Sequence, residues 1–213
     1  MWSELERHYQ SREPIPDQLV RWAMNQILDG QASEAEIKAF LLGLKSIGES
    51  ESDVLALVDV MYQHCLPISI GDRAVDCVGT GGDGFNTINI STAAAIVTTA
   101  AGARVIKHGN RSASSKSGSA DVLEALGINI NLKAEGVGEC VRKIGIGFAF
   151  APNFHPAMRF AAPARKALGQ PTIFNILGPL ANPARPKAVA IGVARSEFLP
   201  IVAGVLARRN CEG

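Results

Sequence analysis

The chain has 213 residues, of which 47% are hydrophobic and 19% are charged, a balance that excludes a disordered protein and allows a small domain beside a larger one. No run approaches the roughly 20 apolar residues of a membrane span, and the start MWSELERHYQ is too polar for a secretory signal, so we expect a cytoplasmic protein with no membrane partner. Residues 1–72 carry 5 Lys/Arg against 12 Asp/Glu and residues 73–213 carry 16 against 8, which favours two domains, the second of which meets an anion.

The first domain, residues 1–72, has the pattern of a small helical bundle. Apolar residues recur at helical spacing over residues 17–28. Two capping boxes, in which a serine is followed three residues later by Glu or Asp, predict helices that begin at Ser33 and Ser50. Short helices with one apolar face must pack together, so we predict a structural or dimer-forming bundle.

From Arg73 onward, strand-like and helix-like segments alternate, which predicts a mostly parallel sheet covered by helices. The predicted fold class is therefore α/β, with a small N-terminal helical domain and a larger, mostly parallel α/β domain at residues 73–213. Strands are expected at residues 74–78, 103–106, near 128, 146–150 and 188–193, and helices at 92–101, 119–126, 134–143, 156–167 and 198–208.

A glycine-rich loop, Gly79-Thr-Gly-Gly-Asp-Gly84, follows the first predicted strand. Glycines at this density let the backbone turn through positive φ and present bare N–H groups to an anion. The spacing also satisfies G-x-G-x-x-G, but no helix follows directly, and Lys107 ends the second strand where a dinucleotide site needs an acidic residue. The loop therefore indicates a phosphate site.

Two further polar segments are expected at the same edge of the sheet. In Asn89-Ile-Ser-Thr92, Ser91 or Thr92 is the expected cap of the next helix, whose start can also bind an anion. The run Lys107–Ser119 is basic and rich in hydroxyl groups. Because the carboxyl ends of parallel strands meet at one edge, these segments predict a polyphosphate pocket. No nucleic-acid partner is expected, because Lys and Arg form no dense run and aromatic residues are 6% of the chain.

Four segments resemble successive signatures of the anthranilate phosphoribosyltransferase family: Val78-Gly-Thr-Gly-Gly-Asp83, Asn89-Ile-Ser-Thr92, Lys107-His-Gly-Asn-Arg111 and Asn175-Ile-Leu-Gly-Pro-Leu180. Their order and spacing also fit, and the resemblance runs along the whole chain. It implies transfer of the phosphoribosyl group from phosphoribosyl pyrophosphate to anthranilate, giving N-(5-phosphoribosyl)anthranilate and pyrophosphate in tryptophan biosynthesis. It also implies Mg²⁺ and a homodimer formed through the helical domain.

The resemblance implies roles for individual residues. Ser91 would ligate Mg²⁺, and Lys107 with Asp83 would stabilise charge in the transition state, with no certain acid, base or nucleophile. Anthranilate would meet Gly79, Asn110, Arg165, His108 and His155, and the guanidinium fork of Arg165 matches a carboxylate. Phosphoribosyl pyrophosphate would be held by Gly79, Gly82, Asp83, Thr87, Asn89, Ile90, Ser91, Thr92, Lys107, His108, Gly109, Asn110, Arg111, Ser112, Ala113, Ser114, Ser115 and Ser119.

The sequence departs from the family pattern at one point. Family members are longer and carry an adjacent Asp-Glu pair that ligates magnesium, and this dipeptide does not occur in the sequence. We therefore expect an α/β domain truncated at its carboxyl terminus, which binds phosphate but forms little product. Two alternatives are a pyrimidine nucleoside phosphorylase, which has a similar lysine-containing loop, and a non-catalytic phosphate-binding or dimerisation module.

Overall fold

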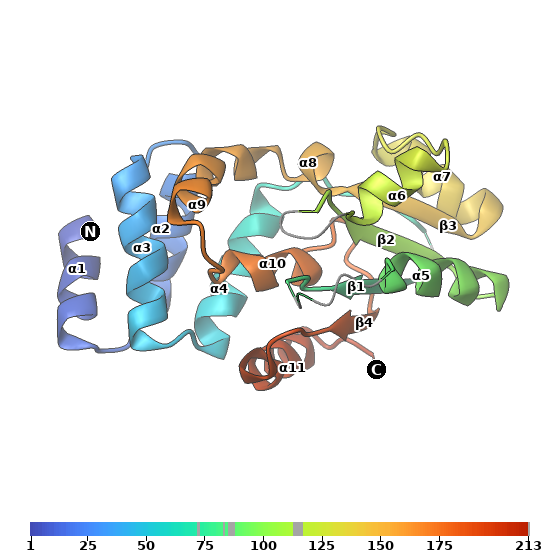
Figure 1. Ribbon diagram of the computed structural model, residues 1–213. Helices are drawn as coiled ribbons and strands as arrows, with labels where there is room; N and C mark the ends of the chain where they lie inside the picture. The colour runs from blue at the N-terminus through green and yellow to red at the C-terminus, as the bar shows by residue number, and fades with distance from the viewer. Residues whose placement is uncertain (72, 83, 85–87, 113–116, 213) are drawn as a thin grey trace. The chain divides into compact units, whose positions relative to one another are not determined.

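The computed structural model describes residues 1–71, 73–82, 84, 88–112 and 117–212. The chain forms two compact units (Figure 1). The first unit comprises Met1–Cys65 and His155–Leu177, and the second comprises Leu66–Phe154 and Gly178–Gly213. In the described part of the chain, no helix combines the length and the apolar character that a membrane crossing requires.

The first unit is built on four α-helices that bury their apolar faces against one another. In this unit α1 packs on α3 and α2 packs on α4. The side chains of Leu5, Met24, Phe40 and Leu57, one from each helix, are fully buried. The helices are α1 (Trp2–Ser11), α2 (Asp17–Leu28), α3 (Glu34–Ile47) and α4 (Glu51–Gln63).

Both predicted capping boxes are present in this unit. The Ser33 hydroxyl oxygen accepts a hydrogen bond from the Glu36 backbone N–H, and the Glu36 carboxylate accepts one from the Ser33 N–H at 2.7 Å. Ser50 and Asp53 form the same reciprocal pair at the start of α4. Each box satisfies amide groups that the first helical turn cannot pair by itself, which confirms the helix starts expected from sequence.

A later part of the chain returns to the helical unit. Residues 155–177 carry a 3₁₀ segment, η1 (Pro156–Ala161), and helix α9 (Ala162–Leu168), which pack on α2 and α3 respectively. Helix α10 (Phe174–Leu180) follows and crosses into the second unit. The first compact unit thus includes this later segment, in which the side chains of Phe174 and Ile176 are buried. The domain ranges 1–72 and 73–213 stay a prediction.

The second unit contains one sheet of four parallel strands in the order β3-β2-β1-β4. The strands are β1 (Val75–Gly79), β2 (Val105–Gly109), β3 (Ile146–Phe150) and β4 (Ala188–Gly192). The register pairs Val75 with both Val105 and Ala188, and Val105 with Ile146. All four strands therefore end at the same edge of the sheet, which confirms the predicted α/β fold class.

Side chains of the strands alternate between two apolar clusters on the two faces of the sheet. On one face Cys77 and Val105 pack with Ala95 of α5 (Ile90–Ala100). On the other face Ile106 and Ala149 pack with α7 (Ala134–Ile144). By this alternation Lys107 lies on the α5 face, whereas its neighbour His108 lies on the α7 face.

The remaining elements complete the second unit. They are α6 (Ser119–Ala125), α8 (Ala151–Phe154), the 3₁₀ turn η2 (Ser196–Phe198) and α11 (Leu199–Arg208). The strand expected near residue 128 was wrong, because this segment is not paired in the sheet. Ile128 is 46% exposed, and the Asn129 side-chain oxygen accepts a hydrogen bond from the Asn131 N–H, which closes a local turn instead.

Candidate functional site

The glycine-rich loop leaves the end of β1 as the sequence predicts. Gly81 and Gly82 have φ values of 65° and 78°, which a residue with a Cβ atom adopts only with strain. The turn is tied to the neighbouring strand, because the Thr80 N–H donates to the Gly192 carbonyl at 2.9 Å and the Thr80 hydroxyl oxygen accepts from the Ala194 N–H at 3.1 Å. Gly81 and Gly82 are exposed, and their amides donate to no other described residue. Such amides can bind an anion.

Helix α5 begins one segment later, and Asn89 caps it. The Asn89 side-chain oxygen accepts hydrogen bonds from the Thr92 N–H at 3.2 Å and from the Thr92 hydroxyl at 2.5 Å, and the Ser91 hydroxyl lies 3.4 Å away. The expectation that Ser91 or Thr92 is the cap was wrong, because both already lie inside the helix. The Ser119 hydroxyl also points at this oxygen, at 3.4 Å. Asn89 therefore joins the start of α5 to the start of α6.

Lys107 is a buried cation at this edge, with 2% of its surface exposed. Its ammonium group donates to the Cys77 carbonyl at 2.7 Å and to the Ser91 hydroxyl oxygen at 3.0 Å. Burial lowers the pKa of Lys107, and the negative charge of Asp76 opposes that change. The side chain thus carries its charge to the first turn of α5, where Ser91 lies.

A buried polar cluster on the opposite face of the sheet was not predicted from sequence. Asp76 is fully buried, and its carboxylate accepts from the His108 N–H at 3.2 Å and from the Asn182 side-chain amide at 2.8 Å. Burial raises the pKa of Asp76 to about 6, against the effects of Asn182, Lys107 and the His108 N–H. The signal for it was a single acidic residue inside the apolar strand Ala74–Val78, which sequence reasoning did not use.

The loop after β2 folds against the start of α6. The Asp121 carboxylate accepts from the Gly118 N–H at 2.7 Å and the Ser112 N–H at 3.1 Å, and these bonds lower the pKa of Asp121. The Arg111 guanidinium is bound to Asp121 at 3.0 Å and to Glu124 at 2.8 Å. In this structure Arg111 thus contacts carboxylates of its own neighbouring helix.

The other polar residues of this loop are held by short-range bonds. The Asn110 side-chain oxygen accepts from the Arg111 N–H at 2.7 Å, and the Asn110 carbonyl accepts from the Ala120 N–H at 3.2 Å. On the α7 face, the His108 ring donates from Nδ1 to the Gly178 carbonyl at 3.1 Å, because a carbonyl can only accept. The loop is therefore bonded to α6, and the end of β2 from which it starts is bonded to α10.

Arg165 and His155 belong to the first unit. Arg165 lies on α9 with its guanidinium 5.7 Å from the centre of the Phe174 ring, and burial lowers its pKa. No carboxylate of the described residues forms an ion pair with it. His155 is 5% exposed and precedes η1, with its carbonyl accepting from the Met158 N–H.

Several predicted site residues cannot be placed in this geometry, because Asp83, Thr87, Ala113, Ser114 and Ser115 lie outside the described residues. Among the residues that are described, no group of three or more His, Cys, Asp or Glu side chains could hold a metal ion. The oxygen atoms of Ser91 and Asn89 do gather at the start of α5. Oxygen ligands suit Mg²⁺, which commonly takes few of them from protein and the rest from substrate phosphates and water. These residues therefore fit a metal ion that arrives with a polyphosphate.

Comparison with known proteins adds to this geometry. The glycosyl transferase family a/b domain matches residues 71–212, and the glycosyl transferase family helical bundle domain matches residues 7–65. The anthranilate phosphoribosyltransferase of Rhodococcus opacus (strain B4) is 56% identical over 89% of this chain and 52% of its own length. That of Saccharopolyspora erythraea is 50% identical over 98% of this chain and 60% of its own length.

Solved structures agree with these relatives. Anthranilate phosphoribosyltransferase from Thermus thermophilus superposes with a TM-score of 0.92 at 40% identity, over 98% of this chain and 64% of that one. The Saccharomyces cerevisiae enzyme in complex with PRPP and Mg superposes with a TM-score of 0.88 at 28% identity, over 98% and 63%. The chain thus spans a little over half the length of the curated relatives it matches. With both of its domains matched, the chain belongs to the glycosyl transferase family that combines a helical bundle with an α/β domain.

Proposed function

We propose that this protein transfers the phosphoribosyl group of phosphoribosyl pyrophosphate to anthranilate, in tryptophan biosynthesis. The observation that carries the proposal is the carboxyl edge of the sheet. There the glycine loop with the exposed Gly81 and Gly82 follows β1, and the buried cation Lys107 at the end of β2 contacts the capped start of α5. Relatives named anthranilate phosphoribosyltransferase support the acceptor, and they do not favour a pyrimidine nucleoside phosphorylase.

The diphosphate group would be held by neutral amides and one fixed cation. The reaction separates charge, with positive charge on the ribose ring and negative charge on the departing pyrophosphate. Fixed dipoles and charges that already point at the site stabilise this charge without reorganisation, usually the largest catalytic term. Lys107 is such a group, because its two hydrogen bonds and its burial hold the ammonium in place before substrate arrives.

We propose that Mg²⁺ accompanies the diphosphate and that Ser91 contributes an oxygen ligand to it. When bound, the ion would neutralise charge on the leaving pyrophosphate. The relative from Saccharomyces cerevisiae was solved with PRPP and Mg. In this chain the Ser91 oxygen accepts a hydrogen bond from Lys107, so the Lys107 ammonium group would be shared between the serine and the phosphates.

The carboxylate of anthranilate would be bound by Arg165. An arginine with no carboxylate partner among the described residues, and with burial lowering its pKa, is suited to a ligand carboxylate, which would complete its hydrogen bonding. Phe174, against which the guanidinium lies, holds the fork in one orientation. Holding the anthranilate amine in line with the departing oxygen would supply much of the remaining rate acceleration.

We further propose that the protein is a cytoplasmic homodimer formed through its helical unit. In that unit the apolar side chain of Leu42 on α3 is 41% exposed, which makes it a position at which this contact can be tested. Replacement of Leu42 by glutamate should convert a dimer to monomers, as measured by sedimentation velocity. A wild-type chain that sediments as a monomer would contradict this proposal.

Binding of phosphoribosyl pyrophosphate is the direct test of the function, because the chain spans only part of its relatives' length. In the presence of MgCl₂, isothermal titration calorimetry should detect binding of phosphoribosyl pyrophosphate to the 213-residue chain. The variant Lys107→Met should bind at least about tenfold more weakly, as expected for loss of one charge-assisted hydrogen bond. The matched control is Lys133→Met, which removes an exposed lysine of the same unit. No binding by the wild-type chain, or equal loss in the two variants, would contradict the proposal.

A further inference from the structure

The carboxyl ends of β1 and β2 contain two polar clusters, one on each face of the sheet. On the α5 face, the Lys107 ammonium contacts Ser91 and the Cys77 carbonyl. On the α7 face, Asp76 contacts the His108 N–H and Asn182. Lys107 and His108 are consecutive, so the bond from Asp76 to the His108 N–H holds the backbone from which the Lys107 side chain projects. The function proposed above uses only the first cluster.

The hydrogen bonds of Asn182 determine what position 76 must provide. The Asn182 amide nitrogen donates both of its protons, one to Asp76 at 2.8 Å and one to the Ile106 carbonyl at 2.9 Å. Its oxygen accepts from the Ala184 N–H at 2.9 Å. Turning the amide over would place oxygen against oxygen at Ile106, so its orientation is fixed by the network. Position 76 must therefore accept on two separate atoms, one facing His108 and one facing Asn182. A carboxylate has two accepting oxygens, whereas an amide has one oxygen and a donating NH₂ group.

The charges of Asp76 and Lys107 also link the two clusters. Among the described residues, Asp76 is the buried carboxylate and Lys107 is the buried lysine, with 0% and 2% of their surfaces exposed. A buried charge without a partner is costly, and each of these residues supplies the charge opposite to the other across the sheet. The carboxylate therefore serves the lysine in two ways, through the backbone and through its field.

We propose that Asp76 and Asn182 are positioning residues of the phosphate site, which fix Lys107 in its binding position from the opposite face of the sheet. This proposal rests on the function proposed above. It assigns a role to two residues that contact no substrate and that none of the four signature segments contains. It also explains why β2 is bonded twice to the end of α10 and the residues after it, by Gly178 to His108 and by Asn182 to Ile106.

Three variants of the whole chain test the proposal by calorimetry with phosphoribosyl pyrophosphate and MgCl₂. Asp76→Asn should weaken binding about tenfold, because it sets an amide N–H against a donor. In a Lys107→Met background, Asp76→Asn should change the affinity by less than about twofold, because residues that act through one another are not additive. A loss of equal size in that background would overturn the proposal.

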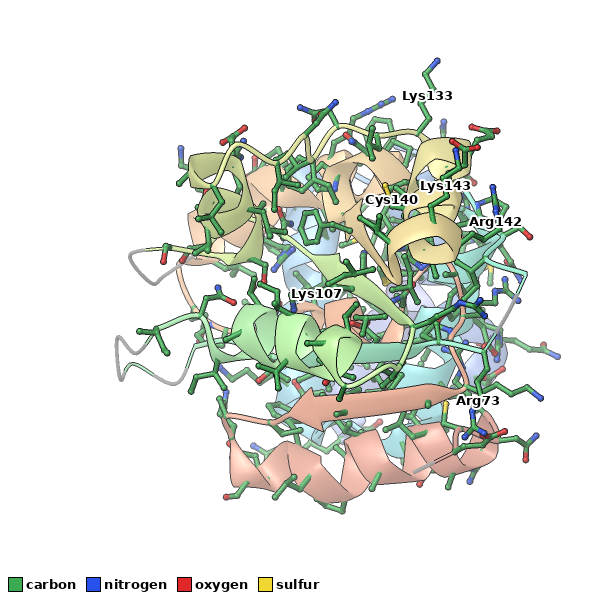
Figure 2. The ribbon with its side chains drawn as sticks, turned by 90° about the vertical axis from the view of Figure 1, so that its right-hand side faces the viewer. Arg73, Lys107, Lys133, Cys140, Arg142 and Lys143 are labelled. Carbon is green, nitrogen blue, oxygen red and sulfur yellow. The ribbon has the colours of Figure 1, made fainter. Side chains whose placement is uncertain are left out.

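A second measurement needs no ligand and separates failure of this proposal from failure of the proposed function. Acetic anhydride labelling followed by mass spectrometry reports how accessible Lys107 is, with the exposed Lys133 as an internal reference (Figure 2). Lys107 should be protected in the wild-type chain and label at least about fivefold faster, relative to Lys133, in Asp76→Asn, because the bond that holds its backbone is lost.

If the wild-type chain binds no phosphoribosyl pyrophosphate, the proposed function fails, and the labelling still decides the positioning role. Unchanged labelling of Lys107 in Asp76→Asn would overturn the proposal whatever the calorimetry shows. If Asp76→Asn does not fold, Asn182→Ala replaces it, since this variant keeps the carboxylate and removes its second donor, together with the bonds of Asn182 to Ile106 and Ala184. It should give a smaller change in the same direction, and no change would again overturn the proposal.

Discussion

A methyl group at position 118 would collide with the loop that follows β2. Gly118 has a φ of −94°, so an alanine there would suffer no backbone strain. Its Cβ atom, however, would lie 2.6 Å from both the Arg111 carbonyl carbon and the Asn110 oxygen, and even closer to the Ser112 nitrogen. Atoms at van der Waals contact are about 3.5–4.0 Å apart, so the loop would have to move by roughly 1 Å.

All the atoms that the methyl group meets are backbone atoms, which cannot rotate out of the way. We expect Gly118→Ala to lower the free energy of unfolding by about 1–3 kcal/mol, the usual cost of overpacking. The displaced loop carries Asn110 to Ser112, so the affinity for phosphoribosyl pyrophosphate should also fall by about tenfold. Urea denaturation followed by circular dichroism measures the first quantity, and calorimetry measures the second.

The same substitution at Gly136 is the matched control. Gly136 lies in α7, where an added Cβ atom meets only the Leu132 side chain, at distances of 3.5 Å or more. Gly136→Ala should therefore raise the free energy of unfolding by about 0.5–1 kcal/mol, because alanine is the better helix former. If the two variants were equally stable and bound phosphoribosyl pyrophosphate equally well, the steric reasoning would be refuted.

Three further predictions follow from the described contacts. The pKa of Asp76 is raised to about 6, so the folded chain holds this proton more tightly than the unfolded chain. The stabilisation from this bound proton is therefore present at low pH and is lost as the pH rises through 6. Urea denaturation should show that the free energy of unfolding of the wild type falls by up to about 3 kcal/mol, relative to that of Asp76→Asn, between about pH 4 and 7. Arg165→Lys should weaken anthranilate binding about tenfold in calorimetry and leave phosphoribosyl pyrophosphate binding unchanged, because a lysine keeps the charge but not the fork. Ser33→Ala should lower the free energy of unfolding by about 1 kcal/mol through loss of the capping box, and a stability equal to wild type would contradict this assignment.

The local features of the fold were predictable from sequence, because short-range chemistry determines them. The serines at 33 and 50 stand at a fixed distance from an acidic residue, and a capping box needs nothing else. The alternation of strands and helices gives the parallel sheet, and the sheet in turn places the glycine loop and Lys107 at one edge. The general position of the proposed phosphate site therefore follows from periodicity and from two loops.

The parts that sequence did not predict depend on contacts between distant residues. Asp76 and Asn182 are 106 positions apart, and neither belongs to a motif. The ion pairs of Arg111 with Asp121 and Glu124 also form only because α6 packs beside this loop. Asn89 rather than Ser91 caps α5, and sequence could not choose between them because Asn, Ser and Thr are all good caps.

The chain crosses from one unit to the other three times, after Cys65, Phe154 and Leu177, and this has a consequence for protease digestion. A single cut in the segment between Cys65 and Ala74 would sever one connection, yet the pieces would not separate under native conditions. The larger fragment would still contain residues 155–177, which lie against α2 and α3 of the smaller one. Such a nicked protein should elute as one species from a sizing column and come apart only in denaturant.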